Sequence, residues 1–265
     1  MTDSLATALV DLQRLAERLR RDCPWDREQT ERTIVPHTVE EAYEVAEAAY
    51  AGDAAKLVDE LGDLLYQTFF LSLLLEEQGQ GSLEHVARSI HDKLVRRHPH
   101  VFGDAAELGS PGAVKKRWEE LKADEGREGV FHDVPGVLPA LLHARKVQRR
   151  AAAVGFEYPD LAGAFADLED ELRELRDAIA GADPRPETEP VDRHFEEAGD
   201  VLFAAVNVAR RLNVDPELAL RAASERFVAR VEEAERMAAA EGRDFAALPL
   251  DEQDRYFDRA KEGAA

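Results

Sequence analysis

Two pairs of acidic residues in the first half of the chain have a spacing that suits metal ligands. Glu41 and Glu44 are three residues apart, and so are Glu60 and Asp63. Residues i and i+3 lie on one face of a helix, so each pair directs two carboxylates toward one point. Gly52 lies midway between the pairs. In an antiparallel helical hairpin that turns at Gly52, the two pairs lie level, which predicts a site of four carboxylates.

The surroundings of these acids favour a metal site over a solvated surface. The chain has 55 acidic residues, so a lone pair three apart is most often ordinary helix surface. Glu60 and Asp63, however, lie among leucines and a valine at 57–65. Four carboxylates brought together raise one another's pKa and cannot all stay ionised without a cation. Oxygen ligands without cysteine suit Mg²⁺, with Mn²⁺ as the alternative, and a phosphate substrate. A di-iron bundle would prefer Glu-x-x-His pairs.

A basic segment follows these acids. Lys93, Arg96 and Arg97 lie close together in the sequence, and helical spacing puts Lys93 and Arg97 on one face. There they could bind the polyphosphate tail that the metal also holds. The alternative is pairing with acidic neighbours on the helix surface. Recurrence of the pair in the second half, as Arg226 and Arg230, favours phosphate binding.

The whole pattern occurs twice, in the same order. The repeated segments are Glu41-x-x-Glu44 with Glu171-x-x-Glu174, Glu60-Leu-Gly-Asp63 with Glu197-Ala-Gly-Asp200, Lys93-x-x-x-Arg97 with Arg226-x-x-x-Arg230, and Trp118-x-x-x-Lys122 with Phe257-x-x-x-Lys261. We therefore predict two tandem helical units, 1–125 and 137–265. The glycine-rich stretch 126–136 is the expected linker. The second unit has a four-carboxylate site of its own.

Helical periodicity dominates the elements that must position these residues. Leucines form one stripe over 5–19, and Pro36 suits the first turn of a second helix that ends near Tyr50. Gly52 then ends that helix, and Asp53 caps the next one, which continues to about Glu77. Strand content should be negligible, so the predicted class is all-α. Further helices are expected over 83–97, 111–124, 137–153, 161–180, 191–212, 215–241 and 249–262.

Composition excludes several classes of partner. The chain has 34 basic and 55 acidic residues, a net charge of −21, which disfavours nucleic acid polymers and anionic membranes. The apolar-rich run 64–75 is too short to span a bilayer, and the N-terminus shows no signal peptide. One cysteine excludes an internal disulfide framework, so we expect a cytoplasmic protein. The run 69–75 is also expected to expose an apolar patch that forms a homodimer.

Taken together, these motifs resemble the MazG family of nucleoside triphosphate pyrophosphohydrolases. The resemblance implies an all-α fold of four-helix-bundle-type units, normally dimeric. It also implies hydrolysis of a nucleoside triphosphate to monophosphate and pyrophosphate, as nucleotide-pool housekeeping. The matching segments are Cys23-Pro24-Trp25-Asp26 with Gln29-Thr30, Glu40-Glu41 with Glu44, Glu60 to Asp63, 93–102 and 118–122, then Lys146 to Gln148, Gly155-Phe156, 171–174, 197–210 and 226–230.

The resemblance also assigns roles to individual residues. Glu40 and Glu41 are the candidates for the general base. The implied Mg²⁺ ligands are Glu41, Glu44, Glu60 and Asp63 in the first unit and Glu171, Glu174, Glu197 and Asp200 in the second. The implied substrate-binding residues are Trp25, Lys93, Arg96, Arg97, Arg226 and Arg230, with Asn207 as a residue suited to a base or sugar.

Several alternatives stay open at the level of the sequence. Asp167 stands where the family's second half often has a lysine, and Asp170 stands where the first unit has Glu40. Asn207, in contrast, occurs only in the second unit, so the sequence does not decide which unit hydrolyses. The alternative function is a catalytically silent, nucleotide- or metal-binding regulatory scaffold for dimerisation. Base preference and the number of metal ions are not set by these motifs.

Overall fold

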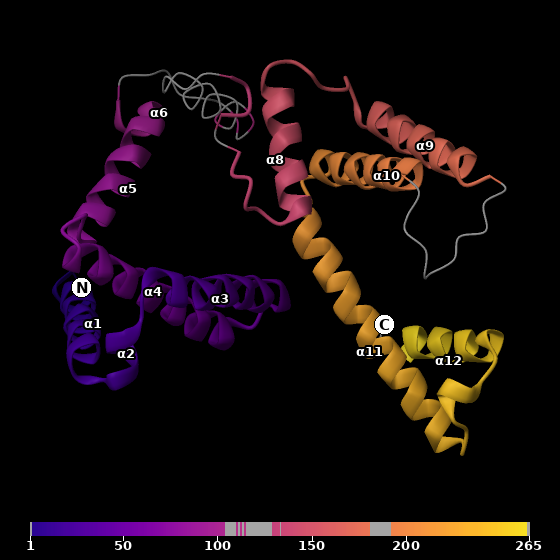
Figure 1. The fold of residues 1–265 in the computed structure, drawn as a ribbon, viewed down its shortest axis with the longest axis horizontal. Helices are drawn as coiled ribbons and strands as arrows, with labels where there is room; N and C mark the ends of the chain where they lie inside the picture. Colours follow the sequence, from indigo (N-terminus) through magenta and orange to yellow (C-terminus); the bar gives the residue numbers. More distant parts are fainter. Residues whose placement is uncertain are drawn as a thin grey trace. The chain divides into compact units, whose positions relative to one another are not determined.

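The computed structural model describes residues 2–103, 110, 112, 114, 129–132, 134–180 and 192–263. All regular structure in these residues is helical, which confirms the predicted all-α class (Figure 1). The chain divides into two compact units, Met1–Lys122 and Ala123–Ala265. Most of the helix expected over 111–124, part of the expected linker 126–136 and the proline-rich loop 181–190 lie outside the described residues.

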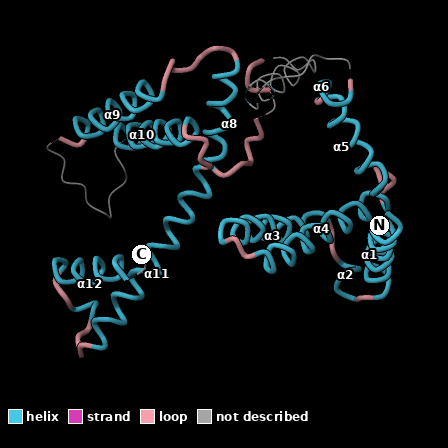
Figure 2. Tube along the Cα trace, turned by 180° about the vertical axis from the view of Figure 1, so that it is seen from behind, coloured by secondary structure: helices cyan, strands magenta, loops and turns pink. Residues whose placement is uncertain are grey.

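The first unit is built on a long helical hairpin. Helices α3 and α4 lie side by side and antiparallel, α1 packs against α4, and α5 continues from the far end of α4 (Figures 1 and 2). The helices of this unit are α1 (Thr2–Asp22), α2 (Pro24–Glu28), α3 (Glu31–Ala51), α4 (Ala54–Glu77), α5 (Leu83–Arg97) and α6 (Pro99–Phe102).

The hairpin turns at the predicted residues. Gly52 adopts the left-handed conformation with φ of 70°, which is accessible to glycine at little cost. Its N–H donates to the carbonyl of Ala49 at 3.3 Å. The Asp53 carboxylate accepts hydrogen bonds from the backbone N–H groups of Ala55 and Lys56, both at 3.0 Å. The turn therefore ends α3 and begins α4 with little unsatisfied backbone.

Replacing Gly52 by alanine is expected to lower the free energy of unfolding of the first unit by about 1 kcal/mol, because a Cβ disfavours this positive φ. The matched control is Gly62→Ala inside α4, where an added Cβ meets nothing within 4 Å. There alanine should stabilise the helix by about 1 kcal/mol. Urea unfolding followed by far-UV circular dichroism measures both changes. Shifts of the same sign would contradict this account of the turn.

The start of α3 corrects the prediction made from Pro36. The helix begins at Glu31, so Pro36 lies inside it. The Thr33 hydroxyl accepts from the N–H of Thr30 at 2.9 Å and donates to the Thr30 carbonyl at 3.0 Å. This local cap begins the helix early, and the proline costs only one intrahelical hydrogen bond.

The core of the first unit also corrects the expected interface. Ile34, Phe70 and Leu74 form one buried cluster, against which Tyr66 and Leu71 pack, and Phe69 is buried as well. The side chains of the apolar run 69–75 are therefore buried or half-buried inside the first unit, and the run does not form the expected exposed patch. The exposed large hydrophobic residues of the hairpin lie elsewhere, at Val35, Val39, Tyr50, Val58, Leu61 and Leu65.

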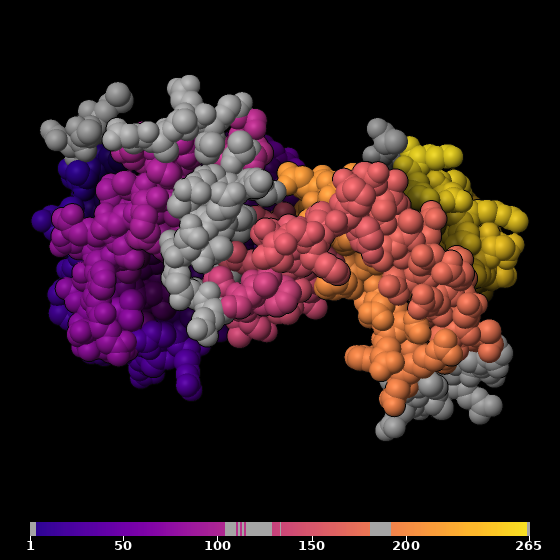
Figure 3. Space-filling model, turned by 90° about the horizontal axis from the view of Figure 1, so that it is seen from above, coloured from indigo at the N-terminus to yellow at the C-terminus, as the bar shows by residue number. Residues whose placement is uncertain are grey.

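The second unit repeats the plan of the first. Helices α9 and α10 form the hairpin, α8 packs against α10, and α11 continues from α10 (Figure 1). The helix α12 packs back onto α11 through Ala234, Ala238, Tyr256 and Ala260, and the C-terminal residues gather in one yellow block in Figure 3. The elements are α8 (Ala140–Ala153), α9 (Leu161–Ala178), α10 (Asp192–Arg211), α11 (Pro216–Ala240), the 3₁₀ turn η1 (Phe245–Ala247) and α12 (Leu250–Gly263). Among the described helices, none combines the length and apolar character that crossing a bilayer requires.

Candidate functional site

Three of the four predicted acids of the first unit lie together on the α3–α4 hairpin. One carboxylate oxygen from each of Glu41, Glu60 and Asp63 lies within 4.8 Å of the other two. Glu60 is the most deeply placed, with 9% of its surface exposed. Glu44 lies near this group, because its charge and hydrogen bonding add to the effect of burial in raising the pKa of both Glu41 and Glu60. We call these four residues the first quartet.

The electrostatics of the first quartet are those of an anionic site that needs a cation. Burial raises the pKa of Glu41, and the charges of Asp63, Glu44 and Glu60 raise it further. Burial likewise raises the pKa of Glu60, with Glu44 as the next cause. The donor set consists of carboxylate oxygens only, which fits a hard divalent cation such as Mg²⁺ or Mn²⁺ and does not favour zinc.

Replacing Glu60 by glutamine is expected to stabilise the metal-free protein at pH 7. Because the folded-state pKa of Glu60 lies above its unfolded value, the carboxylate imposes no penalty below the unfolded pKa, and stability is lost as pH rises through the raised pKa. The gain from Glu60→Gln should therefore be present at pH 7 and vanish near pH 4. Urea midpoints in EDTA at the two pH values measure it.

The control for this prediction is Glu76→Gln, which removes an exposed acid near the other end of α4. This change should give no comparable pH-dependent gain. In saturating Mg²⁺ the wild-type protein should instead be more stable than Glu60→Gln, because the metal binds the native state of the intact quartet more tightly than that of the variant. A Glu60→Gln protein that is less stable than wild type in EDTA at pH 7 would contradict the raised pKa.

The second unit has an equivalent group, the second quartet. Oxygens of Glu171, Glu174 and Glu197 lie within 4.8 Å of one another. Burial raises the pKa of Glu171, and the charge of Asp200 is the next cause, which places Asp200 in the same group. In each unit the structure therefore brings three of the four predicted acids together, and the fourth, Glu44 or Asp200, is close enough to add to the raised pKa of a neighbouring acid.

The two quartets differ in their nearest cation. Arg193 of α10 lies beside the second quartet, with its Nε 3.6 Å from Oε1 of Glu197. Lys56 holds the corresponding place in α4, but its Nζ pairs with Oε2 of Glu47 at 2.7 Å. A protein cation therefore contacts an acid of the second quartet directly, whereas in the first unit the lysine is bound to an acid outside the quartet.

The structure does not place the predicted phosphate-binding residues beside the quartet of their own unit. Lys93, Arg96 and Arg97 lie on α5, which leaves the far end of α4 and points away from the α3–α4 hairpin (Figures 1 and 2). Arg226 and Arg230 lie on α11, which leaves α10 in the same way. Among the described residues, the charges that shift the pKa of Glu41 and Glu60 all come from α3 and α4.

The other general-base candidate lies next to the first quartet. Glu40 is exposed, and its Oε2 lies 3.1 Å from Nδ1 of His37. His37 itself lies one turn before Glu41 on α3 and meets the ring of Trp25 edge-on, at 6.3 Å between centroids. Trp25 is 55% exposed and is carried by α2, a helix that sequence periodicity did not predict.

Two polar residues that the sequence did not single out lie on α4 close to the first quartet. Tyr66 and Gln67 follow Asp63 by one turn. The buried Tyr66 hydroxyl and the buried Oε1 of Gln67 have no hydrogen-bond partner among the described residues. Burial raises the pKa of Tyr66 to about 12, so its hydroxyl is protonated and can donate. The only sequence signal for these residues is their position one turn beyond the acidic pair.

Asn207 is more enclosed than its predicted role requires. It is 9% exposed, and its Oδ1 accepts hydrogen bonds from Nη2 and Nε of Arg210 at 2.6 and 3.1 Å. Arg210 in turn pairs with Glu157 at 2.6 Å. Binding of a base or sugar by Asn207 stays a prediction, for which the amide nitrogen is the remaining group.

Comparisons with known proteins identify the family of the chain. The profile of the MazG nucleotide pyrophosphohydrolase domain matches residues 29–102. The chain is 40% identical over 258 residues to the nucleoside triphosphate pyrophosphohydrolase/pyrophosphatase MazG of Thermotoga maritima, covering 96% of this chain and 95% of that protein. It is 38% identical over 261 residues to the nucleoside triphosphate pyrophosphohydrolase of Escherichia coli K12, with the same coverage. The chain belongs to the MazG family.

The MazG match covers the residues that carry the proposed chemistry in the first unit. Residues 29–102 contain the first quartet together with Lys93 and Arg97. The two relatives extend the similarity over both units, since each covers 96% of this chain. A crystal structure of a mazG-related protein from Thermotoga maritima is 30% identical, covers 43% of this chain and 97% of that chain, and has a TM-score of 0.38.

Proposed function

We propose that this MazG family protein hydrolyses nucleoside triphosphates and deoxynucleoside triphosphates to the monophosphate and pyrophosphate, with Mg²⁺ as cofactor. The observation that carries the proposal is the carboxylate quartet in each unit, within a chain that resembles two named pyrophosphohydrolases over nearly its full length. The all-oxygen donor set supports Mg²⁺, with Mn²⁺ as the alternative.

The residues divide into metal ligands, a base and substrate contacts. The quartets would hold the cation, which lowers the pKa of a bound water and neutralises charge on the phosphates. Glu41 is one candidate for the base, because it lies in the group of acids that would hold the cation and its bound water. Glu40 is the alternative. Trp25 offers an exposed aromatic surface on which a nucleobase can stack.

The proposal includes a homodimer in which α5 of one copy contacts the substrate held at the α3–α4 hairpin of the other copy. Lys93 and Arg97 lie on α5, which leads away from the α3–α4 hairpin of its own chain (Figure 1), so in the proposal they contact the phosphates from a second copy or after a rearrangement. The exposed valines and leucines of α3 and α4 support a covered face. A cytoplasmic role in nucleotide-pool housekeeping completes the proposal; the unpaired Cys23 is compatible with a reducing compartment.

Product analysis tests this function directly. The full chain is incubated with a panel of ribo- and deoxyribonucleoside triphosphates in Mg²⁺, in Mn²⁺ and in EDTA, in water enriched in ¹⁸O. We expect pyrophosphate without label and monophosphate with one ¹⁸O atom, because water attacks the α-phosphorus, and no turnover in EDTA. Orthophosphate with diphosphate as products would contradict the mechanism, and binding without turnover would favour the regulatory scaffold.

A further inference from the structure

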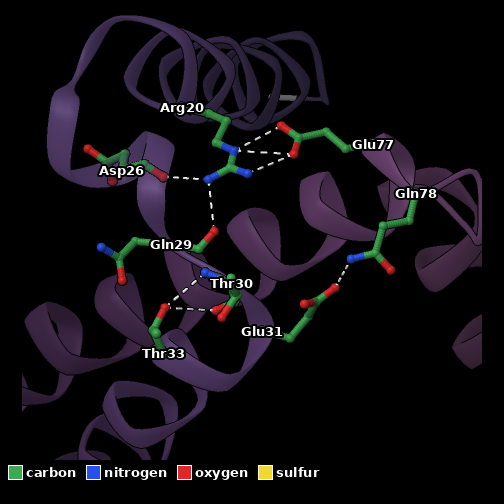
Figure 4. Close-up of polar contacts among 8 residues, drawn as sticks. All are labelled: Arg20, Asp26, Gln29, Thr30, Glu31, Thr33, Glu77 and Gln78. Carbon is green, nitrogen blue, oxygen red and sulfur yellow. Dashed lines mark hydrogen bonds and ion pairs between the residues drawn. The ribbon is translucent and has the colours of Figure 1, made fainter.

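A single arginine joins three segments of the first unit. Arg20 lies in the last turn of α1, and its side chain is only 18% exposed. Its Nε and Nη2 donate to the carboxylate of Glu77, at the end of α4, both at 2.9 Å. Its Nη1 donates to the backbone carbonyls of Asp26 at 2.6 Å and Gln29 at 2.9 Å (Figure 4). One planar guanidinium therefore ties α1, the segment 24–30 and α4 together.

These contacts differ from those of an ordinary surface ion pair. Arg88 and Glu84 in the same unit are 2.7 Å apart, but their side chains are 74% and 72% exposed and lie on one helix. Arg20 instead packs 5.9 Å from the ring centre of the buried Phe70 and uses its donors in two directions. Lysine has the charge but lacks the fixed fork of donors, so it cannot reproduce this set of bonds.

The segment that Arg20 holds carries Trp25. The Gln29 amide donates to the Trp25 carbonyl at 2.9 Å, and Gln29 is itself one of the residues bound by Arg20. Hydrogen bonding between Gln78 and Glu31 fixes the first turn of α3 to the end of α4 (Figure 4). The ring of Trp25 then lies against His37, one turn before Glu41.

The second unit has a comparable ion pair with the charges exchanged. Glu157 lies in the segment after α8, and Arg210 lies in the last turn of α10. Their side chains are 2.6 Å apart and largely buried. Glu157 directly follows Phe156, which is 83% exposed. Both units thus join the segment of an exposed aromatic residue to the end of the hairpin through a largely buried arginine, although Glu77 is 42% exposed and Glu157 only 21%.

We propose that Arg20, with Glu77, is a positioning residue that holds Trp25 beside the first quartet and so sets nucleotide affinity without taking part in the hydrolytic step. This inference rests on the proposed function, in which Trp25 contacts the base. It predicts that loss of the fork raises KM while kcat changes little, because the metal ligands stay on the α3–α4 hairpin.

The test uses the full chain with Glu197→Gln to silence the second quartet and Trp118→Phe to leave Trp25 as the sole tryptophan. Arg20→Lys and Glu77→Gln are expected to raise KM about 10-fold with kcat within about twofold, as expected when binding shared by ground and transition state is lost. The Kd for deoxynucleoside triphosphate with Mg²⁺, from Trp25 fluorescence, should rise by the same factor. Arg88→Ala is the matched control and should change neither quantity.

The outcomes separate this inference from the proposed function. If the parent chain releases no pyrophosphate, the proposal for the first unit fails, and the fluorescence Kd still tests Arg20. If Arg20→Ala does not fold, Arg20→Lys and Glu77→Gln carry the test, with urea midpoints showing that they are native. The positioning role would be overturned if Arg20→Lys kept the wild-type KM and Kd. A lower urea midpoint with both constants unchanged would likewise show that Arg20 acts on stability alone.

Discussion

Changing Glu60 and Glu197 to glutamine in the same chain is expected to lower kcat by at least about 10³-fold, because each quartet loses a charged ligand and the cation's contribution to catalysis goes with it. Glutamine preserves size and shape, so the change isolates charge. Pyrophosphate release at saturating substrate and Mg²⁺ measures the loss. The control is the pair Glu76→Gln and Glu232→Gln, which removes two exposed acids outside the quartets and should leave kcat within about twofold.

The single variants divide the activity between the units. Each should lower kcat without abolishing it if both quartets turn over. We expect the larger loss from Glu60→Gln, because the first unit keeps Lys93 and the Glu40-Glu41 pair. The structure adds a reason, since Arg193 lies 3.6 Å from Glu197 and competes with a metal ion for that carboxylate. An inactive Glu197→Gln protein beside a fully active Glu60→Gln protein would assign the chemistry to the second unit.

The quartets could be predicted because they depend on local rules. The spacing of three residues places two acids on one helical face, and the turn at Gly52 sets which acids lie level. Both features depend only on a segment of about two dozen residues, and both are present in the structure. The start of α3 at Glu31 differs from the prediction for an equally local reason: proline is common in the first turn of a helix, and the sequence alone does not indicate the hydrogen bonds between Thr33 and Thr30.

Features that depend on distant parts of the chain could not be predicted in this way. The sequence shows that 69–75 is apolar, but it does not show which residues bury it. In the folded unit, Phe70 packs in one buried cluster with Ile34. Arg20 and Glu77 are 57 residues apart, so no sequence spacing indicates their contact. The direction of α5 is likewise set by the turn after α4, and helical periodicity carries no information about it.

Because α5 leads away from the hairpin of its own chain, we expect the activity of one copy to depend on the other. With Glu197→Gln in every chain, Arg97→Ala is expected to lower kcat/KM by about 10²-fold, because a charged contact to the phosphates is lost. Glu60→Gln in that background should be inactive. Light scattering of the wild-type protein should give twice the chain mass of 29.5 kDa, and a monomer at assay concentration would contradict the dimer.

Mixing the two inactive variants then shows which copy Arg97 serves. In a mixed dimer of a Glu60→Gln chain and an Arg97→Ala chain, one site combines an intact first quartet with an intact Arg97 only if the arginine acts across the interface. Equal co-expression places about half of the chains in mixed dimers with one working site of two, so about a quarter of the parental activity should return. Glu60→Gln mixed with Asp63→Asn is the control, since both changes damage the same quartet and no site is restored. If the Arg97→Ala mixture stays as inactive as this control, Arg97 serves the quartet of its own chain, and α5 must then move toward the hairpin when substrate binds.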